Sequence, residues 1–233
     1  MTPLISIFLA TLLVSLFSLT GIFALALSDR VLHRILFVVI GLSAGTIMGA
    51  VFFDLLPEAV ELVEGELAYV YIVLGFVLFF FLERFIYWYH GHGHSHEIEH
   101  LPVKPGRQNT RNFAYLNLVG DAIHNFIDGL IIAASFLVNT NVGIATTVAV
   151  IFHELPQEMG DYGILIYSGF TRKMALALNF LVALTVVIGG MSAVFLIDSI
   201  EALSGLLIAV ATGGFIYLGA SELIPELHQE TDL

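Results

Sequence analysis

The sequence predicts an all-α, polytopic transmembrane helix bundle. Of its 233 residues, 58% are hydrophobic and only 12% are charged, and the mean hydropathy is +0.93. Apolar runs of about 18 residues or more suffice to span a bilayer. The chain has seven such runs, at residues 4–27, 34–56, 67–89, 113–138, 143–168, 174–197 and 203–222. Residues 1–233 are therefore expected to form a single transmembrane domain.

Each run is bounded by features typical of a membrane span. The first run lacks the basic start and small-residue cleavage site of a secretory signal, so we expect it to be retained as a span. Glu64 and Glu66 separate the second run from the third, and the turn at 139–141 separates the fourth from the fifth. Arg172 and Lys173 join the fifth run to the sixth.

The basic residues predict the orientation of these spans, because Lys and Arg in short loops stay on the cytoplasmic side. They all fall in or beside one set of alternate connections, which places the N-terminus outside: Arg30, Arg34, Arg84, Lys104, Arg107, Arg111, Arg172 and Lys173. Seven spans then place the C-terminus inside. The polar stretch 226–232 resembles a loop that leads to a further helix. Either the protein has seven spans or an eighth span is missing from this chain, and we expect the second.

Composition also excludes several kinds of chemistry. The chain has no cysteine, so disulfides and thiolate metal ligands are excluded. It has no phosphate-binding loop and no soluble domain, so nothing indicates nucleotide coupling or a nucleic-acid partner. The partners expected are the lipid bilayer and a divalent metal ion, and a homodimer is left open.

The long connection at residues 90–112 is expected to be a His-rich cytoplasmic loop. Its alternating His, Gly and acidic residues have no apolar period and cannot build a packed core. Imidazole binds several transition metals well, so we expect weak metal binding in this loop, for sensing, buffering or delivery. The candidate ligands are His90, His92, His94, His96 and His100.

The fourth and fifth runs carry two polar stripes at membrane depth, where ionisable groups usually mark an ion path. In the fourth run, Asp121, His124, Asn125 and Asp128 have the spacing of one helix face. In the fifth run, His153, Gln157 and Asp161 form one row, and Glu154 and Glu158 form a second row beside it. Facing stripes of this kind predict a metal site whose candidate ligands are His124, Asn125, Asp128, His153, Glu154, Gln157 and Glu158.

Other features of these runs bear on the path of the ion. Pro156 removes a backbone hydrogen bond to the Phe152 carbonyl, and the resulting kink is expected to help open the site. Polar side chains can also simply cross-link membrane helices, but so many on two consecutive spans favour an ion site. Asp121 and Asp161, with Asp54 in the second run and Glu222 in the seventh, are the candidate pathway residues.

The motifs H-N-F-I-D-G and H-E-L-P-Q-E-M-G-D resemble the signatures of the ZIP family of divalent-metal transporters. The resemblance extends to G-L-S-A-G-T and L-L-P-E-A in the second run, the His-rich loop, and G-G-F-I-Y-L-G-A-S-E-L-I-P-E-L in the seventh. The chain is most similar to the branch whose motif is H-E-x-P-H-E-x-G-D. The resemblance implies import of Zn²⁺ or a similar ion into the cytoplasm through eight spans.

The resemblance also implies which residues hold the metal. It suggests a primary site of His124, Asp128, His153 and Gln157, and a neighbouring site of Asn125, Asp128, Glu154 and Gln157. Two departures from the family pattern leave a binuclear site open. Gln157 stands where that branch has His, and the sixth run has Asn179 but no carboxylate where some relatives contribute a ligand.

The expected function is therefore transport of Zn²⁺, or of Fe²⁺, Mn²⁺ or Cd²⁺, as substrate across the plasma membrane, with no catalytic cofactor. His nitrogen and carboxylate oxygen suit all of these ions. A membrane-embedded metalloprotease or hydrolase is an alternative, since His153 and Glu154 begin an H-E-x-x pattern, but Gln157 takes the place of the second His. A metal sensor that does not transport is the third interpretation.

Overall fold

The computed structural model describes residues 2–21, 29–90, 107–199 and 203–229, and these residues are helical almost throughout, with no β-strand among them. The expected all-α class is therefore confirmed. The elements in chain order are α1 (Pro3–Phe17), η1 (Ser18–Thr20), α3 (Asp29–Ala50), η2 (Val51–Leu55), α4 (Leu56–Leu62), α5 (Leu67–His90), α6 (Arg107–Val138), α7 (Thr140–Tyr167), α8 (Arg172–Ala183), α9 (Thr185–Ser199), α10 (Leu203–Tyr217), η4 (Leu218–Leu223) and α11 (Ile224–Gln229).

Each predicted apolar run coincides with helix where the structure describes it. Several boundaries differ from the prediction. In particular, α6 begins at Arg107, before the apolar part of its sequence, the helix of the second run continues through η2 and α4 to Leu62, and the sixth run divides into α8 and α9 at Leu184. Five helical segments of the described chain are long and apolar enough to cross a membrane: Pro3–Thr20, Arg34–Leu62, Phe113–Val138, Arg172–Leu196 and Leu203–His228. The chain is therefore an integral membrane protein.

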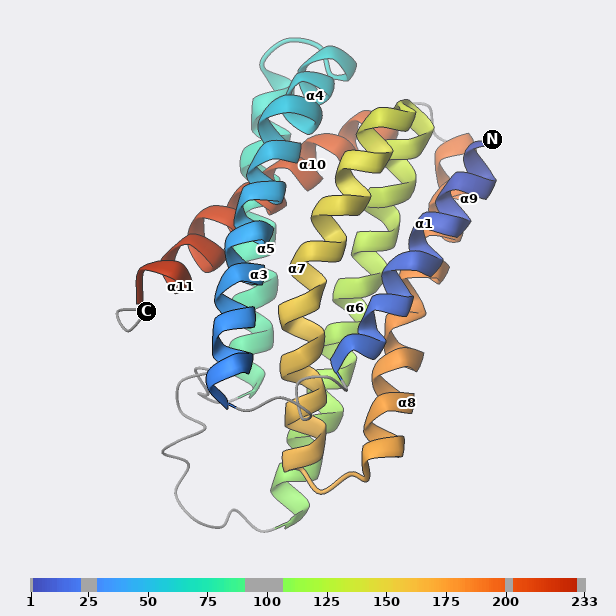
Figure 1. The fold of residues 1–233 in the computed structure, drawn as a ribbon. Coiled ribbons are helices and arrows are strands. Elements are labelled where there is room, and N and C mark those ends of the chain that lie inside the picture. Colours follow the sequence, from blue (N-terminus) through green and yellow to red (C-terminus); the bar gives the residue numbers. More distant parts are fainter. Residues whose placement is uncertain (1, 22–28, 91–106, 200–202, 230–233) are drawn as a thin grey trace.

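The helices run up and down between two ends of the bundle (Figure 1). The first turns of α3, α6 and α8 and the last turns of α5 and α7 gather at the lower end in this view, and the α6–α7 connection lies at the upper end. α10 crosses the bundle obliquely and packs on α5. α6 and α7 each have an exposed apolar face, but their polar stripes face the interior of the bundle, where Asp128, His153 and Glu154 are buried.

Glycines allow two helix pairs to approach closely. A side chain on Gly129 of α6 would overlap the Val186 carbonyl of α9, and one on Gly189 of α9 would overlap the Phe126 carbonyl. The packing of α5 on α10 is similar, because a side chain on Gly213 would overlap the backbone of Ile72. These contacts make α6·α9 and α5·α10 the most extensively packed pairs, as is typical of small residues between membrane helices.

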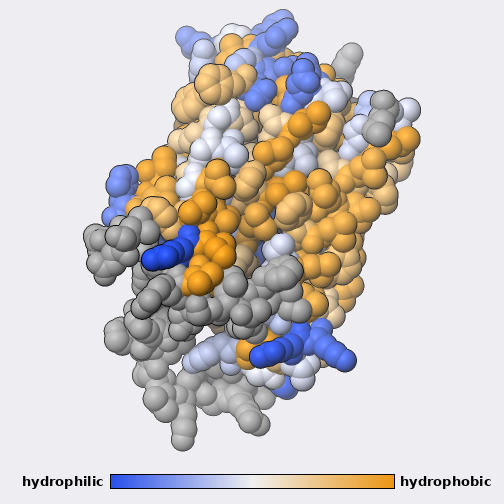
Figure 2. All heavy atoms as spheres, in the orientation of Figure 1, coloured by the Kyte–Doolittle hydropathy of each residue, from blue (hydrophilic) through white to orange (hydrophobic). Residues whose placement is uncertain are grey.

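The outer surface has the distribution of side chains that a bilayer requires. Figure 2 shows apolar side chains over the middle of the visible face and hydrophilic ones mainly at its two ends. Large apolar side chains such as Val38, Val119 and Ile188 are each 58% exposed. An exposed apolar area of this extent on a soluble protein would favour aggregation, whereas here it matches lipid contact.

Three prolines lie within helical segments, and the helix accommodates them in two different ways. Pro57 follows the π-helical segment η2, and Pro225 follows the π-helical segment η4, so the helix widens just before each proline. Pro156 lies inside α7, which continues past it to Tyr167. The Phe152 carbonyl, which Pro156 leaves without an intrahelical donor, accepts a hydrogen bond from the Ser43 hydroxyl of α3.

Candidate metal site

The antiparallel pair α6 and α7 carries both predicted polar stripes. Asn139 alone separates the two helices, and its side-chain oxygen accepts a hydrogen bond from the Asn141 backbone N–H at 2.8 Å, which caps α7. Such a short connection keeps the helices side by side, so residues at similar distances from the turn meet. Asp128 and His153 meet in this way, with 3.1 Å between Oδ2 and Nε2.

Four ionisable side chains converge at this point of the bundle. His124 Nε2 lies 3.3 Å from Glu154 Oε1 and 3.7 Å from Asp128 Oδ2. His153 Nε2 lies 3.5 Å from Glu154 Oε1 and 3.4 Å from His124 Nε2. One atom from each residue lies within 4.8 Å of the others. We call His124, Asp128, His153 and Glu154 the four-residue cluster.

The separations within the four-residue cluster match the edges of a tetrahedron around a transition metal. Zinc binds nitrogen and oxygen ligands at about 2.0–2.1 Å in tetrahedral sites, which places the ligand atoms about 3.3 Å apart. The distances between the four atoms, where measured above, run from 3.1 to 3.7 Å. Little rearrangement is needed for the two imidazoles and two carboxylates to hold such an ion.

Hydrogen bonding and burial prepare these atoms for an ion. The Nδ1 atom of His153 lies 3.2 Å from the Ala149 carbonyl oxygen, a partner that keeps the proton on Nδ1 and leaves Nε2 as the acceptor. Asp128 and Glu154 are 0% and 2% exposed, and Asp128 Oδ1 and both Glu154 oxygens have no hydrogen bond within the described chain. Buried polar atoms without a partner are costly, and a bound cation would remove that cost.

The two predicted amide ligands contact a neighbouring carboxylate instead of the four-residue cluster. Asn125 Nδ2 donates to Asp121 Oδ1 at 2.8 Å, and Gln157 Nε2 donates to the same oxygen at 3.2 Å. The structure thus brings Glu154, where the family resemblance implies Gln157, beside His124, Asp128 and His153. Glu158 points to a third helix, and its carboxylate accepts a hydrogen bond from Asn179 Nδ2 of α8.

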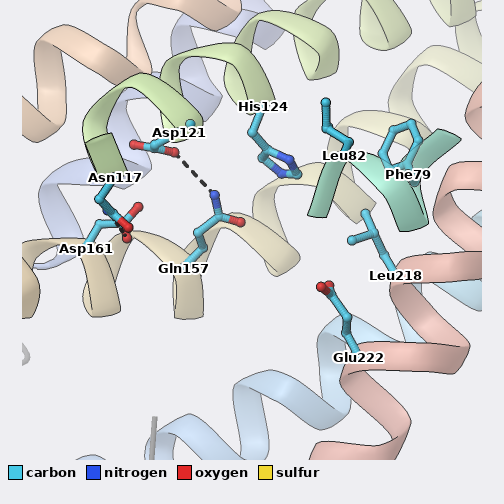
Figure 3. A pocket seen from close by; sticks show the side chains of 10 residues that line it. Phe79, Leu82, Asn117, Asp121, His124, Gln157, Asp161, Leu218 and Glu222 are labelled. Atoms are coloured by element: carbon cyan, nitrogen blue, oxygen red, sulfur yellow. Dashed lines mark hydrogen bonds between the residues drawn. The ribbon is translucent and has the colours of Figure 1, made fainter. Parts of the chain in front are cut away.

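A cavity of about 240 Å³ adjoins the four-residue cluster at His124, and its lining includes Asn117, Asp121 and Asp161, which lie nearer the end of the bundle where α6 begins and α7 ends. Asp161, which also lines the cavity, accepts a hydrogen bond from Asn117 Nδ2 at 2.7 Å. Figure 3 shows Asp121, Gln157 and His124 along the cavity, with Glu222 facing them from the opposite side. The lining residues are Phe79, Leu82, Asn117, Gly120, Asp121, His124, Gln157, Asp161, Leu218 and Glu222.

The other side of the four-residue cluster is closed by apolar packing. Toward the α6–α7 connection, Ile132 and Phe136 of α6 and Val150 of α7 are buried in the main core. The Phe215 ring of α10 lies 5.9 Å from the His153 ring, measured between centroids. Among the described residues, this apolar packing and the cavity thus lie on opposite sides of the four-residue cluster.

The remaining predicted residues lie in three places. Asp121, Asp161 and Glu222 line the cavity, whereas Asp54 lies in η2 and is not among the lining residues. His90 is the last residue of α5, and the rest of the predicted His-rich loop falls outside the described residues.

Sequence reasoning missed Asn117, Asn179 and Ser43 as parts of the site. Asn117 stands four residues before Asp121 and extends the same helix face, so its spacing alone could have placed it. Asn179 and Ser43 contact α7 from other helices. No pattern within one helix reveals a contact of that kind.

Comparison with known proteins assigns the family. The protein-family model described as "ZIP Zinc transporter" matches residues 2–110 and 89–233 of this chain. The chain is 42% identical over 124 residues to "Zinc transporter zipt-7.2" of Caenorhabditis elegans, in an alignment that covers 52% of this chain and 27% of the relative. It is 41% identical over 130 residues to "IAA-alanine resistance protein 1" of Arabidopsis thaliana, covering 54% and 28%.

A third relative is "Zinc transporter ZIP13" of Mus musculus, which is 37% identical over 127 residues that cover 54% of this chain and 35% of the relative. The matched part of the chain thus spans about a third or less of these relatives. The family match confirms the resemblance seen in the motifs, and it agrees with the expectation that the chain is not an enzyme. The chain belongs to the ZIP zinc transporter family.

Proposed function

We propose that this protein transports a divalent transition-metal cation, with Zn²⁺ as the principal substrate, through the four-residue cluster between α6 and α7. The observation that carries the proposal is that each of the two imidazole nitrogens lies 3.1–3.7 Å from both carboxylate oxygens and 3.4 Å from the other nitrogen. Two nitrogen and two oxygen donors suit Zn²⁺. Fe²⁺, Mn²⁺ and Cd²⁺ also accept such ligands and are candidate competing substrates.

We further propose that the ion moves into the cytoplasm. The cavity extends from His124 past Asp121 to Asp161. This direction is toward the end of the bundle where α6 and α8 begin, and Arg111, Arg172 and Lys173 belong to that end. The positive-inside rule assigns this end to the cytoplasm and the N-terminus to the outside. The described conformation then corresponds to an inward-open state in a plasma-membrane protein, from which the ion leaves past Asp121 and Asp161.

Transport requires a second conformation that opens the other end. Alternating access commonly uses one group of helices that rocks against another. The close backbone contacts of α6 with α9 and of α5 with α10 suggest that each pair moves as a unit. All four proposed ligands come from one chain, so the site needs no residue from a second copy.

The test is uptake of radioactive Zn²⁺ by cells that express the full chain, with substitutions at the cluster and away from it. We expect His153→Ala to abolish uptake while the protein remains inserted and folded, because a ligand at the centre of the site is lost. The matched control is His228→Ala, since His228 is an exposed histidine in α11. Uptake at the normal rate by His153→Ala would refute the proposed site.

The same variants separate a transporter from a sensor. Purified protein in vesicles should produce a fluorescence signal from an enclosed zinc indicator when Zn²⁺ is added outside. A protein that binds Zn²⁺ with the expected loss in His153→Ala, yet moves no ion into the vesicles, would be a metal sensor rather than a transporter.

A further inference from the structure

A group of carboxylates lies next to the four-residue cluster and shares one residue with it. Asp121 of α6 and Glu154 and Glu158 of α7 each offer one oxygen, and these oxygens lie within 4.8 Å of one another. The three residues are 5%, 2% and 2% exposed. Glu154 and Glu158 are four residues apart, so they occupy successive turns of one helix face. We call Asp121, Glu154 and Glu158 the carboxylate cluster.

Neutral amides hold the carboxylate cluster in place and leave oxygens free. Asn125 and Gln157 both donate to Oδ1 of Asp121, at 2.8 and 3.2 Å, whereas its Oδ2 is buried with no hydrogen bond in the described chain. Asn179 Nδ2 donates to the carboxylate of Glu158 and, at 3.3 Å, to its backbone carbonyl. Oε2 of Glu154 is likewise buried and has no hydrogen bond among the described residues.

The described chain has too few cationic side chains near the carboxylate cluster to balance three ionised carboxylates. His124 and His153 approach Glu154, at 3.3 and 3.5 Å, and no Lys or Arg of the described chain forms an ion pair with any of the three acids. Taking a charge out of water without a partner costs several kcal/mol. A bound cation supplies the missing positive charge and takes up the free oxygens at the same time.

We propose that Asp121, Glu154 and Glu158 form a second cation site whose protein ligands are all oxygens, one helical turn from the His-containing site. Carboxylate oxygen favours Mn²⁺, Mg²⁺ and Ca²⁺ over softer ions, so this site takes a divalent cation of that class. Asp121 lines the cavity, which gives the site a route for entry and exit.

The inference deepens the proposed function and rests on it for the source of the ion. Glu154 belongs to both clusters, so one carboxylate can hand an ion from the two imidazoles to Asp121 and Glu158. The proposed site differs from the second site that the family resemblance implies, because Asn125 and Gln157 use their N–H groups to position Asp121. The neighbouring acids, rather than these amides, then supply the ligands.

The test uses Mn²⁺ as the probe on the purified full chain in lipid nanodiscs, followed by electron paramagnetic resonance. Wild type should bind Mn²⁺, and the double variant His124→Ala/His153→Ala should still bind one equivalent whose spectrum shows no coupling to nitrogen. Asp121→Asn and, separately, Glu158→Gln should weaken that equivalent by about tenfold or more, within the range seen when groups around a metal are changed. Glu66→Gln, an exposed acid outside the cluster, is the matched control.

Each outcome bears on the proposal. Loss of all Mn²⁺ binding in the double His variant, or Asp121→Asn and Glu158→Gln proteins that are folded and bind Mn²⁺ normally, would overturn it. If the double His variant takes up protons at this cluster and binds no Mn²⁺, the cluster is a proton site and the proposal is wrong. Zinc uptake that depends on His153 in the same preparations would leave the proposed function intact, which separates the two failures.

Discussion

Ser43 and Pro156 are predicted to be energetically coupled, although they lie on different helices. Pro156 has no N–H, so the Phe152 carbonyl loses its partner within α7, and the Ser43 hydroxyl of α3 donates to that carbonyl. Ser43 is 0% exposed. Ser43→Ala therefore removes the hydrogen bond to the partly buried Phe152 carbonyl, and we expect the free energy of unfolding to fall by about 1–3 kcal/mol.

Pro156→Ala should make the Ser43 hydroxyl largely redundant. Alanine at 156 returns a backbone N–H that can donate to the Phe152 carbonyl within α7. In the Pro156→Ala background, Ser43→Ala should lower the free energy of unfolding by about 0.5 kcal/mol or less, because the Phe152 carbonyl keeps the hydrogen bond from the residue 156 N–H. The expected coupling energy between the two positions is therefore about 1 kcal/mol or more, a size typical of residues in direct contact.

The assay is equilibrium unfolding in detergent micelles for the wild type, both single variants and the double variant. Thr46→Ala serves as the matched control, because the Thr46 hydroxyl bonds only to Leu42 and Ser43 carbonyls of its own helix, at 2.8 and 3.1 Å. Thr46→Ala should lower the free energy of unfolding by the same amount whether residue 156 is proline or alanine. A Ser43–Pro156 cycle that is additive within about 0.5 kcal/mol would refute the reasoning.

Three further predictions concern the metal and the topology. Asp128→Asn should weaken Zn²⁺ binding about 100-fold by calorimetric titration, since one of four ligands accounts for about 3 kcal/mol of a four-ligand zinc site; a change below about threefold would exclude Asp128 as a ligand. Deleting residues 90–100 should leave uptake intact while removing weaker metal equivalents that fade as pH falls through about 6.5, because protonated imidazole cannot bind metal; lost uptake in a folded deletion would make the loop an obligatory relay. In this cysteine-free chain, Asn141→Cys should react with an impermeant maleimide from outside intact cells and Lys173→Cys only after lysis, and the reverse pattern would invert the proposed orientation.

Most of the fold follows from the sequence because hydrocarbon imposes strict conditions on a chain. A spanning segment must satisfy its backbone hydrogen bonds internally, so long apolar runs can only be helices. The ends of the spans are harder to place from sequence. α6 begins at Arg107 because a helix can extend beyond the apolar region into polar surroundings, where hydropathy no longer marks its boundary.

The site is predictable from sequence where its residues share a helix face. The spacing of Asp121, His124, Asn125 and Asp128 is enough to place them on one side of α6. Helix spacing does not determine the rotation of one helix against its neighbour, and that rotation decides whether Glu154 or Gln157 approaches the imidazoles. Contacts made from α3 and α8, by Ser43 and Asn179, depend on tertiary packing alone.

The residue at position 157 has a further consequence for the proposed oxygen site. Gln157 donates an N–H to Asp121 Oδ1 at 3.2 Å, whereas a carboxylate at this position would have no N–H to donate and would repel Asp121. A buried carboxylate so close to Glu154 and Glu158 needs donors on its free side. The amide that weakens position 157 as a metal ligand thus allows Asp121 to stand beside the other two acids. The loss of one candidate ligand and the presence of the carboxylate cluster are, in this view, two effects of the same residue.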